Sequence, residues 1–107
     1  MKHTNNTNRK GDFAEYYAVT WLWDNGYEVF QNSGCSGPVD IIAMSTEGEL
    51  TLIDVKTLKK DKRRKAQYQS AGGGVMTEHQ KKLGVKFLGF HPDTRQLRFI
   101  EHKEWKN

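Results

Sequence analysis

The stretch PVDIIAMSTEGELTLIDVK, residues 38–56, holds two apolar runs on either side of a short polar turn. Apolar alternation flanking a glycine-containing turn predicts a β-hairpin. Residues 46–48 (TEG) suit a three-residue loop, because glycine takes the left-handed position that such a loop requires. The loop sets the register of the two strands. This register pairs Ser45 with Glu49, Met44 with Leu50 and Ile42 with Leu52.

At the end away from its turn, the hairpin carries three charged residues. Extended by two residues, the register places Asp40 directly opposite Asp54. Cβ atoms of facing residues lie about 4.5–5.5 Å apart, a separation at which like charges destabilise a sheet. Two carboxylates so close either share a proton or hold a cation. Strand alternation puts Lys56 on the same face as Asp54, while Ile53 and Val55 point into the core.

A carboxylate pair with a neighbouring lysine suits metal-assisted chemistry on a phosphodiester. Mg²⁺ prefers oxygen ligands, takes few of them from protein, and fills its other positions with water and phosphate. Such an ion activates the attacking water and stabilises the departing oxygen. An ammonium beside it supports the developing negative charge. The residue types predict Mg²⁺ as the cofactor, with Mn²⁺ as the alternative.

An alternative interpretation of the three charges is purely structural. Asp40 can simply end a loop, and Asp54 with Lys56 can form an exposed salt bridge worth under about 1 kcal/mol. The hairpin is otherwise apolar on both faces, so we expect its charges to lie near the core. Unpaired carboxylates are costly there, which favours the catalytic interpretation.

The rest of the sequence predicts further helices and strands around the hairpin. A helical pattern runs from about residue 9 to residue 25, and Gly26 suits its end. Strands are expected at 27–32, 85–90 and 96–102, of which the last two form a second hairpin.

The segment between the two hairpins contains a loop and a second helix. Residues 59–75 include KKDKRRK and three consecutive glycines, and we expect them to form a loop. Thr77 and Gln80 make a capping box that starts a helix, which by itself explains Gln80. The predicted order is α-β-β-β-α-β-β, an α/β fold in which helices flank a mixed central β-sheet.

The first helix has two apolar faces when its residues are placed about 100° apart. Glu15 lies at the edge of the broader face, which we assign to the core: Phe13, Ala14, Tyr17, Ala18, Trp21 and Leu22. The opposite side carries Tyr16, Val19 and Trp23, which contact between two copies of the chain would explain.

Composition limits the class of protein. The 107 residues suit one domain, with 1–8 as a polar tail. The net charge of +4 is weak support for a nucleic-acid partner. Cys35 is the single cysteine, so an internal disulfide is excluded and a reducing compartment is expected. No apolar run approaches the roughly 20 residues of a membrane span, and we expect a cytoplasmic protein with no membrane partner.

The string PVD, then thirteen residues, then DVK resembles the signature of the PD-(D/E)XK nuclease superfamily. The segment KGDFAEYYAVTWLWDNGYEVFQNSGCSGPVDIIA is similar to archaeal-type Holliday junction resolvases, whose cores resemble restriction endonucleases. The resemblance covers residues 9–58 well and continues more loosely through TEHQKKL (77–83). It implies a metal-dependent, homodimeric endonuclease that cuts branched DNA.

The resemblance also implies roles for individual residues. Glu15, Asp40 and Asp54 would hold the metal, and Lys56 would be the catalytic lysine. Ser33 or Ser36 would lie near the cleaved phosphate. Basic residues of the first helix and of the run after the catalytic strand are expected to contact DNA: Arg9, Lys10, Lys59, Lys60, Lys62, Arg63 and Arg64.

Two other functions stay open on the sequence. The same core can cut another DNA form, such as a flap, a nick or a duplex site. It can also bind DNA without cleaving it. Residue types at all four carried-over positions (Glu15, Asp40, Asp54 and Lys56) suit cleavage, so we favour the junction-resolving endonuclease.

Overall fold

The structure is a computed structural model that describes residues 6–34, 37–61, 67–71 and 76–100, with the backbone alone at 6–8, 10, 59–61 and 67–71. Within these residues, two helices and six strands follow one another. They are α1 (Asn6–Asp24), β1 (Glu28–Gln31), β2 (Ile41–Met44), β3 (Leu50–Asp61), β4 (Gln67–Ala71), α2 (Glu78–Leu83), β5 (Lys86–Phe90) and β6 (Leu97–Phe99). The predicted α/β class, a mixed sheet flanked by helices, is confirmed.

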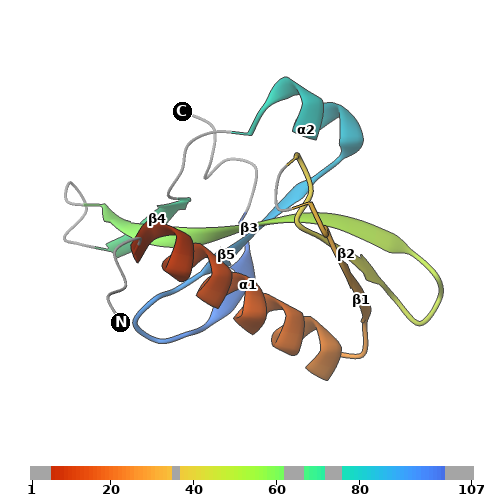
Figure 1. The fold of residues 1–107 in the computed structure, drawn as a ribbon, viewed down its shortest axis with the longest axis horizontal. Helices are drawn as coiled ribbons and strands as arrows, with labels where there is room; N and C mark the ends of the chain where they lie inside the picture. The colour runs from red at the N-terminus through yellow and green to blue at the C-terminus, as the bar shows by residue number, and fades with distance from the viewer. Residues whose placement is uncertain (1–5, 35–36, 62–66, 72–75, 101–107) are drawn as a thin grey trace.

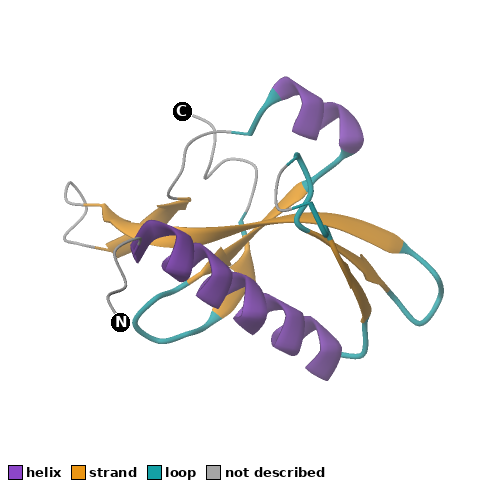
Figure 2. Ribbon diagram, in the orientation of Figure 1, coloured by secondary structure: helices purple, strands orange, loops and turns teal. Residues whose placement is uncertain are grey.

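The strands form one sheet in the order β1-β2-β3-β5-β6, and β4 pairs with the far end of β3. β3 and β5 run parallel, whereas the other pairs are antiparallel. Figure 1 shows β3 as the long central strand, with α1 on one side of the sheet and α2 on the other. Figure 2 shows the same arrangement by type of element.

Each face of the sheet has its own hydrophobic cluster, as strand alternation requires. The cluster on the α1 side contains Ala18, Leu22, Ile41, Ala43, Ile53 and Leu88. The cluster on the other side contains Leu58, Met76, Phe87 and Ile100. Asp54 and Lys56 alternate with Ile53 and Val55 along β3, so they face away from α1.

The hairpin has the predicted turn and register. Ile42 pairs with Leu52 and Met44 with Leu50. Beyond them, the Ser45 amide donates to the Glu49 carbonyl oxygen at 2.8 Å. Gly48 has a φ of 88°, the left-handed conformation that the loop requires.

Helix α1 is longer at its start than predicted. It begins at Asn6, so residues 6–8, which we expected in a polar tail, are helical. Asn and Thr are favoured near helix starts, so their polarity does not mark the boundary. At the other end the Tyr27 amide donates to the Leu22 carbonyl and the Gly26 amide to the Trp23 carbonyl, with Gly26 at φ 92°. This Schellman arrangement confirms the predicted glycine cap.

The predicted core face of α1 is correct at its centre and wrong at one edge. Ala14, Ala18 and Leu22 are buried. Phe13 is 44% exposed, because it lies against Phe90 at the last position of β5. Residues 101–102 of the last predicted strand, Cys35 and residues 1–5 lie outside the described residues.

The prediction of a loop at residues 59–75 is wrong in part. β3 continues to Asp61 and pairs with β4, through Leu58 with Ala71 and Asp61 with Gln67. Beyond Leu58, β3 continues with Lys59, Lys60 and Asp61, so this part of the strand has no apolar alternation that a sequence pattern could reveal. The capping box of α2 and the hairpin of β5 and β6 are confirmed.

None of the helices in the described part of the chain has the length and apolar content that crossing a membrane requires.

Candidate active site

Asp40 lies immediately before β2, where the backbone is held from two sides. Its amide donates to the Ile53 carbonyl oxygen at 2.8 Å, and its own carbonyl accepts from the Asn32 amide at 2.9 Å. The Asn32 side chain donates to the Val39 carbonyl at 2.9 Å. Asp40 is therefore positioned by both β1 and β3, the strands on either side of β2.

The Asp40 carboxylate supplies a hydrogen-bond acceptor for β3 where the pairing with β2 ends. The last pair between β2 and β3 is Ile41 with Ile53, and Ile41 is the residue that follows Asp40. The Asp40 Oδ2 then accepts from the Val55 amide at 2.8 Å. This contact satisfies a β3 donor and brings the carboxylate beside Asp54.

The two aspartates form the close carboxyl pair that the hairpin register predicts. Burial and a hydrogen bond with the Asp54 carboxyl raise the pKa of Asp40 to about 7, although the bond from Val55 acts in the opposite direction. The negative charges of Asp54 and Glu15 add to the increase. Near neutral pH the pair therefore holds an extra proton, which a cation could replace.

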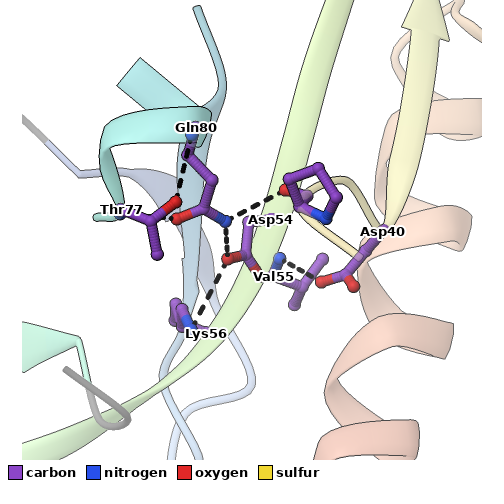
Figure 3. A network of polar contacts seen from close by, with 7 residues as sticks. Asp40, Asp54, Val55, Lys56, Thr77 and Gln80 are labelled. Carbon is purple, nitrogen blue, oxygen red and sulfur yellow. Dashed lines mark hydrogen bonds and ion pairs between the residues drawn. The ribbon is translucent and has the colours of Figure 1, made fainter. Parts of the chain in front are cut away.

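Lys56 lies beside Asp54 on the face away from α1. Its Nζ is 3.5 Å from the Asp54 Oδ2 and 5.2 Å from the centre of the Phe87 ring. Asp54 is only 9% exposed, so the ion pair is largely shielded from solvent. Figure 3 shows Asp54 and Lys56 on β3, and Asp40 approaching Val55 from the segment before β2.

Gln80 is a member of this site that the sequence analysis missed. It was assigned only to the capping box of α2, but its Nε2 also donates to the Asp54 Oδ2 at 2.7 Å. The two residues are 26 positions apart, and no spacing or motif in the sequence relates them.

Glu15 lies near the aspartates without contacting them. Its carboxylate accepts from the Gln31 side chain at 3.4 Å. Burial raises the pKa of Glu15, and the charges of Asp12 and Asp54 act in the same direction, against the bond from Gln31. Within the described ranges no three His, Cys, Asp or Glu side chains come close enough to hold a metal ion. A role for Glu15 as the third ligand stays a prediction.

The donor set around Asp40 and Asp54 fits a divalent cation. Two carboxyls that hold an extra proton at neutral pH are expected to exchange it for a metal ion, and Mg²⁺ needs only one or two protein carboxylates. Asp40 and Asp54 would hold the ion directly. Glu15 carries a further negative charge close by.

The residues predicted to contact DNA are only partly described. Arg9, on the first half of α1, and Ser33, in the turn after β1, are exposed. Lys10 belongs to α1, while Lys59 and Lys60 belong to β3 at a register shift. The rest lie outside the described residues: Ser36, Lys62, Arg63 and Arg64.

A small cavity of about 210 Å³ adjoins Asp40. Its lining comes from the end of β1 and the start of β2: Phe30, Gln31, Asn32, Val39, Asp40, Ile41 and Ile42. Phe30 is 53% exposed, so an aromatic ring on the surface lines the same cavity as Asp40.

The architecture around this site is that of a mixed α/β fold in which a central hairpin carries the acidic pair. A solved structure with a similar fold is that of a bacterial homing endonuclease, I-Ssp6803I, with a TM-score of 0.71 and 16% sequence identity. The match covers 94% of this chain and 72% of that one. At this identity the similarity is one of fold.

No family model matches the sequence, and no curated protein is significantly similar to it.

Proposed function

We propose that this protein is a divalent-metal-dependent endonuclease that hydrolyses DNA phosphodiesters. The observation that carries the proposal is the Asp40–Asp54 carboxyl pair, with the Lys56 Nζ 3.5 Å from Asp54. Burial and the neighbouring Asp54 raise the pKa of Asp40 to about 7, an arrangement typical of functional sites. The fold shared with a homing endonuclease also supports the proposal.

Each residue of the site has a defined task in this reaction. Asp40 and Asp54 would hold the cation, which when bound would supply an activated water and neutralise charge at phosphorus. Lys56 places its ammonium beside this centre, where it stabilises negative charge on the phosphate oxygens. The cavity lined by Phe30 offers room for a base or sugar next to the cleaved bond.

We propose a four-way DNA junction as the substrate, because the motifs in residues 9–58 resemble those of junction resolvases. Cutting a junction on opposing strands needs two active sites, which a two-fold symmetric dimer provides. The outer side of α1 suits such a contact, since Tyr16 is 68% and Trp23 is 67% exposed.

The fold of a homing endonuclease favours a second candidate, cleavage of a duplex site. A third is a protein that binds DNA without cutting it. These candidates differ in the DNA that is cut, so one experiment separates them.

The test is incubation of an end-labelled four-way junction with Mg²⁺, Mn²⁺ or EDTA, beside duplex, flap and nicked controls of matched sequence. We expect paired, metal-dependent cuts confined to the junction. Cuts in the duplex control would support the second candidate. Tight binding without cleavage in any metal would leave only the third.

The matched control for this assay is the double variant Asp40→Asn, Asp54→Asn. It removes both carboxylates and keeps the size of each side chain. We expect it to bind the junction and leave it intact, whereas cleavage by this variant would show that the active site lies elsewhere.

A further inference from the structure

Gln80 joins three segments of the chain through one buried side chain. Its Oε1 accepts from the Thr77 amide at 3.1 Å, and its Nε2 donates to the Pro38 carbonyl oxygen at 2.9 Å and to the Asp54 Oδ2 at 2.7 Å. Only 6% of Gln80 is exposed. Figure 3 shows the amide directed from α2 into the site.

These contacts exceed what a helix cap requires. The capping box uses the Oε1 of Gln80 and the Thr77 hydroxyl, which accepts from the Gln80 amide at 3.0 Å. The side-chain NH₂ group has no part in that motif and could face water on an ordinary surface helix. Here it donates to a carboxylate and to the loop just before Asp40.

Gln80 donates both of these hydrogen bonds, so it acts on the site by holding the two acceptors in place. Gln80 and Lys56 both approach the Oδ2 of Asp54, which leaves the Oδ1 for the Asp40 carboxyl or a cation. The bond to Pro38 holds the segment that leads into Asp40. One amide thus holds Asp54 directly and Asp40 through the backbone.

We propose that Gln80 is a positioning residue that orients Asp54 relative to Asp40 and couples the start of α2 to the site. Its consequence for catalysis rests on the proposed endonuclease function. The coupling between Gln80 and Asp54 does not, because it follows from the hydrogen bonds alone.

The chemistry of the amide separates positioning from capping. A glutamate three residues into a helix completes a capping box as well as a glutamine does. An ionised glutamate only accepts hydrogen bonds and cannot donate to Asp54 or to Pro38. Gln80→Glu keeps the cap but also brings a further carboxyl beside Asp54, so Gln80→Met is the variant that removes the donor without adding charge. Thr77→Ala weakens the cap and keeps the contacts to the site.

The first test uses NMR on the metal-free protein, so it does not depend on nuclease activity. The side-chain NH₂ protons of Gln80 should exchange slowly with water in the natural protein and in Thr77→Ala. They should exchange at least about tenfold faster in Asp54→Ala, which removes their acceptor. Equal exchange in all three proteins would overturn the coupling.

The second test compares Gln80→Glu, Gln80→Met and Thr77→Ala in cleavage kinetics and thermal unfolding. We expect both Gln80 variants to lower kcat about 10- to 100-fold with KM nearly unchanged, as loss of a partner behind a metal ligand does. Thr77→Ala should lower the unfolding midpoint and leave kcat as it is. Gln80→Glu should lower the midpoint at least as far as Gln80→Met does, because its carboxyl lies beside Asp54, and it should not recover kcat.

Two outcomes of these tests would count against the proposals. If Gln80→Met cleaves like the natural protein, Gln80 does not position the site and the inference is wrong. If the natural protein cleaves no DNA in any metal, the proposed function fails, and the NMR exchange alone decides whether Gln80 holds Asp54.

Discussion

Asp40 lies where its surroundings disfavour the ionised carboxylate and where hydrogen bonds fix its position. The Val55 amide and two backbone contacts hold it in place. Burial and the neighbouring Asp54 nevertheless raise its pKa to about 7. A carboxyl that is held in a fixed position and has a raised pKa is well suited to bind a cation, because the cation stabilises its ionised form.

Asp40→Asn should change how stability depends on pH. In the unfolded chain Asp40 ionises near 3.8, and in the folded protein its pKa is about 7. The folded state therefore holds a proton that favours it fully below about pH 4, and this contribution is lost as pH rises through about 7. Relative to Asp40→Asn, the natural protein should lose stability from about pH 4 to about pH 8.

Urea unfolding in EDTA across this pH range measures the effect. Glu47→Gln is the matched control, because Glu47 is exposed in the hairpin turn. It should follow the pH profile of the natural protein. Parallel profiles for Asp40→Asn and the natural protein would contradict the assignment of the raised pKa.

Lys56→Met should impair the chemical step and spare the fold. Methionine keeps a similar unbranched stem over Phe87 and removes only the ammonium 3.5 Å from Asp54. We expect kcat for DNA cleavage to fall about 10²- to 10³-fold, the range for losing one group that stabilises charge in the transition state. Lys86→Met, at an exposed lysine of β5, should retain full activity in the same gel assay.

At the scale of elements, the site depends on how closely β5 approaches β3. Lys56 pairs with Gly89 across the two parallel strands. A Cβ built on Gly89 would lie 2.7 Å from the Leu58 Cδ2 and 3.1 Å from two atoms of Ile100. The absence of a side chain at Gly89 is therefore what lets this hydrophobic cluster close beside Lys56.

Gly89→Ala should destabilise the protein by about 1–3 kcal/mol, the usual cost of overpacking a core. Thermal or urea unfolding measures the change. Gly11→Ala is the control, since a Cβ at Gly11 meets no atom within 4 Å and lies in a helix. It should stabilise by about 0.5–1 kcal/mol, and a similar gain at Gly89 would show that the cluster has room to spare.

At the scale of the whole molecule, the outer side of α1 offers a surface for a second copy. A groove of about 540 Å³ lies beside it, between α1 and the hairpin of β5 and β6, lined by Tyr17, Val19, Thr20, Trp21, Trp23, Asp24, Arg95 and Leu97. Arg95 closes one end, with its guanidinium 4.6 Å from the centre of the Phe13 ring and donating to the Tyr17 hydroxyl at 3.0 Å. The groove overlaps the stripe that the sequence predicts as an interface.

Trp23→Glu should convert the proposed dimer to a monomer, because it places a charge in an apolar contact. Sedimentation velocity measures the change in mass. Leu50→Glu is the control, since Leu50 is 61% exposed near the hairpin turn and should leave the dimer intact. A Trp23→Glu variant that stayed dimeric would exclude this side of α1 as the interface.

The sequence by itself determined the features that depend on neighbours along the chain. A three-residue turn with Gly48 sets one register, and that register brings Asp40, Asp54 and Lys56 together. The capping box and the glycine that ends α1 are equally local, because each is a hydrogen-bond pattern within a few residues.

Only the tertiary structure decided the contacts between distant segments. β4 pairs with β3 through backbone hydrogen bonds, and the sequence of these segments has no apolar alternation that would predict the pairing. Gln80 has the residue type and spacing of a helix cap. Its second role exists because the fold places the start of α2 beside Asp54 of β3. Local patterns record what the chain does over a few residues, whereas a hydrogen bond across 26 residues depends on packing, which no short stretch of sequence encodes.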